Sequence, residues 1–275
     1  DLPVLGMLIA DLHSEIGQYS SALKILELIE TNVEHTLEKQ QGLMQKIKQS
    51  PLLFRSDFSH RGYLFRYGQL KRVIGKLDEA QQVLEKAVQA APDDDQVLNA
   101  LVGAATASLD KGKALQLIEA HNPLIQNFQD LDLNQLDLAC AQMEISLDQG
   151  DVDSVRKAFS QPSLNDRGYP RIFAIKSRLA AKDGNLSEAH ENLGRAIQDY
   201  DENFRNNNPA TPSELFRMLA NLQSITDASI EVEDYNSAHQ FQSEAWKNLN
   251  NQPDVNFRYA QLITRSAEKQ QVAQA

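Results

Sequence analysis

The sequence contains little of what most enzymes and metal-binding proteins need. Its 275 residues include one cysteine, Cys140, which excludes an intrachain disulfide framework and a cysteine-rich metal site. Neither GxGxxG nor GxxxxGK[ST] occurs, and the six histidines are scattered, without an HExxH motif or a carboxylate cluster at ligand spacing. We therefore predict no catalytic residue, no metal site and no cofactor, and we expect that the chain is not an enzyme.

Long apolar runs are also missing. The longest, residues 2–10, is about half the length that a membrane-spanning helix requires, so we expect no membrane span. The chain begins at Asp1 rather than at a methionine, which indicates a piece of a longer protein. The sequence therefore does not determine the localisation of that protein. The single cysteine fits a reducing compartment, which favours the cytoplasm.

What the sequence does contain is a repeat. Its clearest copy is residues 61–94, in which Leu64, Tyr67 and Ile74 share one helical face, Gly75 interrupts the helix and Pro92 stops the next one. This copy resembles the tetratricopeptide repeat, which has a period of 34 residues. The small, glycine, alanine, large apolar, small and proline positions of that pattern correspond here to Gly68, Gly75, Ala80, Leu84, Ala87 and Pro92.

Weaker copies keep the hinge between two helices. These hinges fall at residues 17, 150, 184 and 233, with a shortened hinge at residues 110–113. The resemblance implies an all-α, right-handed α-α superhelix of about six helix hairpins, a TPR-like solenoid that forms one domain over residues 1–275. We also expect an extra helix at 31–49, a flexible loop at 203–212 and a capping helix at 254–272. Nothing polar caps the N-terminal end, where we expect another domain of the same chain to dock.

Charge is unevenly distributed along the chain. Residues 39–76 hold nine basic residues against one acid, Asp57, so this segment carries +8 while the other 237 residues carry −19. The same segment is rich in aromatic residues. A basic, aromatic surface fits an acidic peptide or helix, whereas the surrounding negative charge disfavours nucleic acid. A solvated helix face without a partner is the plain alternative.

In tetratricopeptide arrays the first helix of each hairpin lines a concave groove. On this resemblance we predict a partner-binding set that combines groove positions with neighbouring basic residues. It consists of Arg61, Phe65, Arg66, Gln69, Arg72, Asn99, Arg171 and Arg178. Three acids, Asp11, Glu144 and Asp227, would face the same groove. The lysine and asparagine positions with which some cochaperones clamp a terminal carboxylate are not matched, so we infer no chaperone-tail binding.

The functional prediction is a non-catalytic protein–protein interaction scaffold or adaptor. It would bind a peptide or helix of a protein partner, acidic in character, in the concave groove. The alternative is a regulatory or sensor domain of a longer signalling protein, which binds a small peptide or docks an effector domain.

Overall fold

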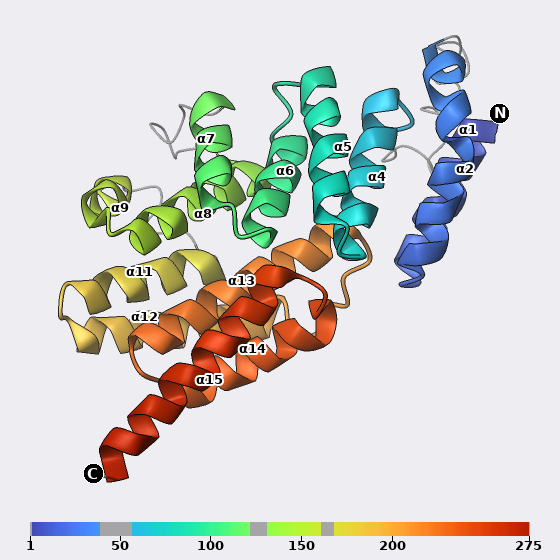
Figure 1. Ribbon diagram of the computed structural model, residues 1–275. Coiled ribbons are helices and arrows are strands. Elements are labelled where there is room, and N and C mark those ends of the chain that lie inside the picture. The colour runs from blue at the N-terminus through green and yellow to red at the C-terminus, as the bar shows by residue number, and fades with distance from the viewer. Residues whose placement is uncertain (1, 39–56, 122–130, 161–167, 275) are drawn as a thin grey trace. The chain divides into compact units, whose positions relative to one another are not determined.

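The computed structural model describes residues 2–38, 57–121, 131–160 and 168–274. Within these ranges the chain forms thirteen helices and no strand, which confirms the all-α prediction (Figure 1). They are α1 (Leu2–Glu15), α2 (Tyr19–Glu38), α4 (His60–Val73), α5 (Leu77–Ala90), α6 (Asp95–Ala107), α7 (Lys111–His121), α8 (Leu133–Gln149), α9 (Val152–Phe159), α11 (Pro170–Lys182), α12 (Leu186–Asn203), α13 (Pro212–Glu231), α14 (Tyr235–Leu249) and α15 (Pro253–Gln274). The helices form two compact units: unit 1 holds residues 1–104 and 210–214, and unit 2 holds residues 105–209 and 215–275.

Each predicted hinge at a glycine is a tight turn with left-handed backbone. Gly17, Gly75, Gly150 and Gly184 have φ angles of 75°, 83°, 84° and 77°, and Glu233 stands at the equivalent turn with a φ of 64°. A side chain makes this conformation costly, which is why glycine is usual there. The five hinges predicted at these positions are confirmed.

The shortened hinge predicted at residues 110–113 is wrong. Helix α6 ends at Ala107 and α7 begins at Lys111, so the turn is residues 108–110, with Leu109 at a φ of 64°. The Asp110 side chain accepts a hydrogen bond from the backbone N–H of Lys113 at 2.9 Å. This N-cap allows α7 to begin earlier than its Lys-Gly-Lys sequence suggests.

In unit 1 the clean repeat forms the hairpin of α4 and α5 (Figure 1). A Cβ atom added to Gly68 would lie 2.5 Å from the Cγ atom of Leu84, so glycine is what allows the two helices to approach this closely. The ring of Tyr63 stacks on that of Tyr67, and its hydroxyl donates to the carbonyl of Leu26 at 3.2 Å. That bond ties α4 to α2.

Unit 2 has its own apolar core. Helices α8, α9 and α11 pack around a cluster that includes Leu136, Cys140, Phe159 and Ile172. Cys140 is fully buried, as expected of a small apolar core residue. Further along the chain, Ile230, Ala238 and Leu262 join α13, α14 and α15.

The three predicted departures from the regular repeat have different outcomes. Residues 31–38 continue α2, whereas 39–49 lie outside the described residues. The segment at 203–212 connects α12 to α13, and Phe204 within it stacks on Tyr200, so its flexibility remains a prediction. Helix α15 contains the predicted capping helix. Among the described residues, no helix combines the length and the apolar character that crossing a bilayer demands.

Candidate functional site

The aromatic residues of the basic segment belong mostly to the core of unit 1. Phe58, Tyr63 and Tyr67 are buried, at 1%, 3% and 6% exposure, and Phe54 lies outside the described residues. Phe65 is the aromatic side chain of α4 that stays partly exposed. The interleaved aromatic residues therefore serve mainly to pack the helices of unit 1. Among the described aromatic residues of the segment, Phe65 is the one that a partner could reach.

Arg66 is tied to its own unit rather than presented to solvent. Its guanidinium donates to both carboxylate oxygens of Asp11, at 2.7 and 3.0 Å, and to the backbone carbonyls of Asp57 and Gly62. These bonds link α1 to α4. A two-point arginine–carboxylate contact with further carbonyl acceptors is among the stronger polar contacts in proteins, so Arg66 stabilises unit 1.

Arg61 and Lys71 are neutralised in the same way. Arg61 pairs with Asp57 at 2.6 Å and also with Asp94. The Lys71 ammonium donates to Glu79 and lies 4.4 Å from the centre of the Tyr67 ring. Burial by itself would lower the pKa of Lys71, but the hydrogen bonds with Glu79 and Tyr67 raise it above its ordinary value. The charges of Arg61, Arg66 and Lys71 are thus balanced by acids within unit 1.

Two predicted groove residues of α4 reach neighbouring helices. Gln69 is 4% exposed, and its Nε2 atom donates to the hydroxyl of Ser213 at 3.2 Å, at the start of α13. The guanidinium of Arg72 lies against Gly103 of α6, where a Cβ atom would come within 2.5 Å of Nη1. Asn99 precedes Gly103 by one helical turn and is half-buried. Arg72 of α4 and Gly103 of α6 therefore lie in contact within unit 1, and the groove itself stays a prediction.

Arg171 of unit 2 is almost fully buried among acids. It donates to both oxygens of Glu144, at 2.7 and 3.2 Å, and to Asp137 at 3.3 Å. Asp137 also accepts from the Tyr169 hydroxyl at 2.5 Å and from Arg217 at 2.8 Å. Burial by itself would lower the pKa of Arg171, but Glu144 and Asp137 raise it well above its ordinary value. The charge is permanent and fully engaged.

Arg178 lies seven residues further along α11 in a similar setting. Its Nη2 atom pairs with Asp148 at 2.7 Å and with Glu231 at 3.0 Å. Lys111 reaches the same Asp148 at 2.5 Å, and Lys182 reaches the same Glu231 at 3.6 Å. Helices α7, α8, α11 and α13 are joined by this chain of charges.

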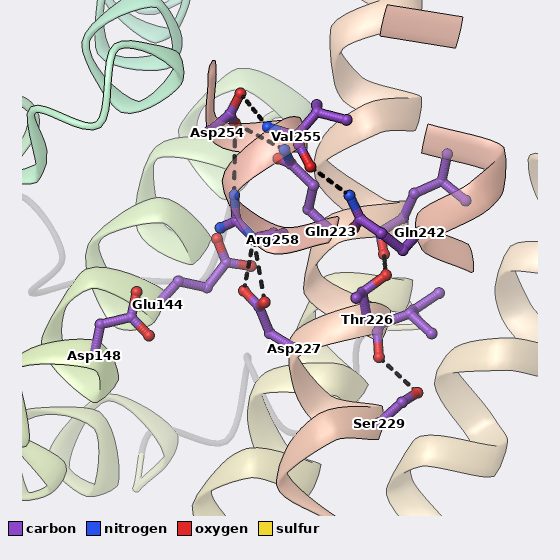
Figure 2. Close-up of polar contacts among 12 residues, drawn as sticks. Glu144, Asp148, Gln223, Thr226, Asp227, Ser229, Gln242, Asp254, Val255 and Arg258 are labelled. Atoms are coloured by element: carbon purple, nitrogen blue, oxygen red, sulfur yellow. Dashed lines mark hydrogen bonds and ion pairs between the residues drawn. The ribbon is translucent and has the colours of Figure 1, made fainter. Parts of the chain in front are cut away.

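A third arginine, Arg258, completes the network at the start of α15. It pairs with Asp227 at 3.2 Å and with Asp254 at 3.5 Å, and Asp254 also accepts from the Gln223 amide at 2.7 Å. Figure 2 shows Arg258 between these two acids, with Glu144 and Asp148 approaching from α8. Burial by itself would lower the pKa of Arg258, but Asp227 and Asp254, and then Asp148 and Glu144, raise it above its ordinary value.

The three acids predicted for the groove have one thing in common. Each pairs with an arginine from another helix, Asp11 with Arg66, Glu144 with Arg171 and Asp227 with Arg258. The sequence prediction did not foresee these pairs and did not name network members such as Asp137, Asp148 and Arg258. The spacing of seven residues between Asp137 and Glu144, matched by seven between Arg171 and Arg178, is the sequence signal that could have identified part of the network.

The contacts described for these residues are ion pairs and hydrogen bonds. Cys140 is buried in the core, and within the part of the chain that the structure describes no group of three or more His, Cys, Asp or Glu side chains could hold a metal ion. Arg61, Phe65, Gln69 and Arg72 lie on α4 and Asn99 lies on α6, both in unit 1, and their role as a binding set stays a prediction. Arg171 and Arg178 belong to unit 2, where a partner could reach their charges only by displacing acids of the chain itself.

Comparison with solved structures identifies the fold. The chain is similar to a tetratricopeptide repeat protein from Parabacteroides merdae, with a TM-score of 0.52 and 14% identity over 98% of this chain and 88% of that one. It is also similar to an assembly chaperone of RpL4, Acl4, with a TM-score of 0.51 and 13% identity over 99% of both chains. No family model and no curated protein sequence matches. The chain has a tetratricopeptide-like helical-repeat fold, as its sequence predicted.

Proposed function

We propose that the chain is a non-catalytic protein-interaction scaffold that binds an acidic peptide or helix on the shared face of α4 and α6 in unit 1. The observation that carries this proposal is the contact of Arg72 with Gly103, because it brings α4, which bears Phe65 and Gln69, against α6, which bears Asn99. The helical-repeat fold supports it, since such folds present extended surfaces to partners. One similar solved structure is described as an assembly chaperone of RpL4, and we infer a protein partner here as well.

In this proposal Phe65 is the anchor and Arg61 recognises acidic side chains, while Arg72, at 8% exposure, supports the face from within. Phe65 is partly exposed, so a partner can cover it and gain the free energy of apolar burial. Arg61 keeps 22% of its side chain exposed while paired with Asp57 and Asp94, so an acidic partner would share or exchange that pairing. We assign Arg66 to internal support, and also Arg171 and Arg178, whose side chains are 6% and 3% exposed.

The test is to select, from a random library, short peptides that bind the whole chain. The affinity of each selected peptide is then measured. We expect acidic peptides with at least one large apolar residue, and binding that weakens as salt rises. Phe65→Ala should weaken binding by about tenfold or more, because truncating an interface anchor removes roughly 1.4 kcal/mol or more.

The matched control is Phe257→Ala, which removes another exposed phenylalanine, 48% exposed, from unit 2. Selected peptides that bind Phe65→Ala and Phe257→Ala as tightly as they bind the wild type would show that Phe65 is not part of the binding site. Selected peptides without acidic residues would refute the electrostatic part of the proposal.

A further inference from the structure

Helix α1 and the turn that follows it carry a row of aliphatic side chains that are exposed in the described part of unit 1. Leu2, Leu5, Ile9, Leu12 and Ile16 are 60%, 54%, 37%, 61% and 68% exposed. We call these five residues the α1 stripe. Single exposed apolar residues are ordinary, but four along one side of a helix and a fifth in the turn directly after it are a mark of an interaction surface.

The stripe lies on the side of α1 that faces away from α2. Val4, Met7 and Ala10 are buried on the other side, and a Cβ atom on Gly6 would lie 2.7 Å from Ile29 of α2. The internal packing of α1 is therefore complete without the stripe. The stripe is additional surface rather than a loose edge of the core.

The spacing of the stripe specifies the shape of what covers it. Its members follow one another at intervals of three, four, three and four residues, which is the a/d spacing of a coiled-coil seam. A seam of this kind packs against another helix with the same period. We therefore expect the occupant to be a helix with an aliphatic seam.

The charged residues near the α1 stripe indicate which kind of helix can cover it. Asp11 is neutralised by Arg66, and His13 is hydrogen-bonded to Gln18 at 2.7 Å, which leaves Glu15 as the one carboxylate of α1 that faces solvent without an ion pair among the described residues. A strongly charged partner helix would find no unpaired charge on α1 except Glu15 among the described residues. A second copy of α1 has the same aliphatic seam and meets no like-charge repulsion if the two helices run in opposite directions.

We propose that the α1 stripe is a self-association surface, on which the α1 helices of two copies of this chain pack antiparallel about a twofold axis near Ile9. In this direction Glu15 of each copy lies toward the N-terminal end of the other α1, whose free N–H groups favour negative charge. The same patch serves both copies, as an isologous contact requires.

The contact is small, so the dimer is weak. Helix α1 has 14 residues and is about 21 Å long, and one such seam covers less than the roughly 800 Å² a side of a standard interface. We expect a dissociation constant on the order of 10 μM or weaker. Self-association should then be visible at high protein concentration and absent at nanomolar concentration.

The first test is sedimentation equilibrium of the whole chain from about 1 μM to about 500 μM, a range that brackets the expected constant. The wild type should pass from the mass of one chain to that of two, while the double variant Leu5→Asp/Leu12→Asp should keep the mass of one chain throughout. The control double variant, Leu133→Asp/Leu186→Asp, changes leucines of similar exposure, 51% and 55%, in unit 2 and should dimerise as the wild type does.

The second test reports the geometry and does not depend on the aspartate variant folding. Cys140 is buried, so a cysteine introduced on α1 is the reactive thiol among the described residues. Ile9→Cys should oxidise readily to a disulfide-linked dimer, because the two copies of residue 9 lie near the axis. Leu2→Cys should not crosslink with itself, because in the antiparallel pair the two copies of residue 2 lie at opposite ends.

A wild type that stays monomeric at all these concentrations would overturn the proposal and would favour another domain of the same chain as the occupant. Leu2→Cys that crosslinks with itself as readily as Ile9→Cys would overturn the antiparallel geometry. Neither outcome bears on the face of α4 and α6. Peptides selected for that face should bind Leu5→Asp/Leu12→Asp and the wild type equally.

Discussion

The arginines of the two units have the same chemistry but different surroundings. In unit 1 the side chains of Arg61 and Arg66 keep 22% and 15% of their surface exposed, and each pairs with one or two acids. In unit 2 the side chains of Arg171 and Arg178 are 6% and 3% exposed, and their acids are shared with further cations. The difference lies in what each arginine faces, because all four stand on first helices of the repeat.

This comparison shows how a repeat protein can neutralise its own inner positions. An acid on one first helix meets an arginine on another at three places in the chain, and in unit 2 these pairs connect into a network. An arginine at such a position is available to a partner only where the neighbouring helices leave it partly exposed. Arg61 in unit 1 is partly exposed in this way, whereas Arg171 and Arg178 in unit 2 are buried.

The largest effect should come from breaking the buried network. Arg171→Met keeps the length of the side chain but leaves Glu144 without its arginine, and removing one partner of a buried pair costs about 3–5 kcal/mol. Arg66→Met breaks a more exposed pair, and we expect about 1.5–3 kcal/mol, the range for hydrogen bonds to charged groups. Urea unfolding of both variants measures the difference.

The control for this pair of variants is Arg195→Met. Its ion pair with Glu191 has side chains that are 57% and 64% exposed, so the loss should stay within about 1 kcal/mol. Equal destabilisation by Arg171→Met and Arg195→Met would mean that the network of unit 2 contributes no more than a surface ion pair.

A smaller effect on stability should distinguish a hairpin whose helices approach closely from one whose helix has free space beside its glycine. In the α4–α5 hairpin of unit 1, Gly68→Ala puts a Cβ atom 2.5 Å from Leu84, and overpacking of this kind costs about 1–3 kcal/mol. In the α11–α12 hairpin of unit 2, nothing lies within 4 Å of a Cβ atom on Gly194, so Gly194→Ala should stabilise the helix by up to about 1 kcal/mol. Melting temperatures should therefore move in opposite directions, and a rise for both would refute the close contact.

The smallest expected effect is a pH dependence of the network. Burial raises the pKa of the Asp148 carboxyl, but Arg178 and Lys111 lower it more, so its pKa lies below the ordinary value. A folded pKa below the unfolded one, about 3.9, stabilises the fold above that pH, and the contribution is lost as the pH falls through the folded pKa. Wild type should therefore exceed Asp148→Asn in stability at pH 7, and the two should converge below about pH 4.

Urea midpoints at several pH values between neutral and strongly acidic measure this convergence. Asp153→Asn is the control, because the side chain of Asp153 is 91% exposed and should contribute little at any pH. A difference between wild type and Asp148→Asn that stays constant with pH would contradict the assignment.

Sequence reasoning proposed a candidate surface in unit 1 but did not foresee the acids that neutralise two of its arginines. The spacing of Arg61, Phe65, Gln69 and Arg72 placed them on one side of a helix, and helical geometry alone is enough for that inference. The acids that neutralise Arg61 and Arg66 lie on other elements, at Asp94 and Asp11. A count of charge along residues 39–76 could not include them.

The hinges show one local signal that is easily recognised in the sequence, a glycine between two helices, and one that is not, a capping aspartate. A glycine between two amphipathic helices identified four turns, and the match in register identified the fifth at Glu233. At Leu109 neither signal was present. The structure shows that Asp110 caps α7 there, and a capping aspartate looks the same in sequence as a loop aspartate.

The sequence by itself determined the helices, their turns and the tetratricopeptide-like repeat, because these depend on interactions between residues close together along the chain. Only the tertiary structure decided which charges are free and which are neutralised, and which apolar face stays uncovered. Arg171 meets Asp137 34 residues away, and Arg217 meets the same Asp137 across 80 residues. Such pairs form when packing brings distant helices together, and the low polarity of the packed interior then makes them strong.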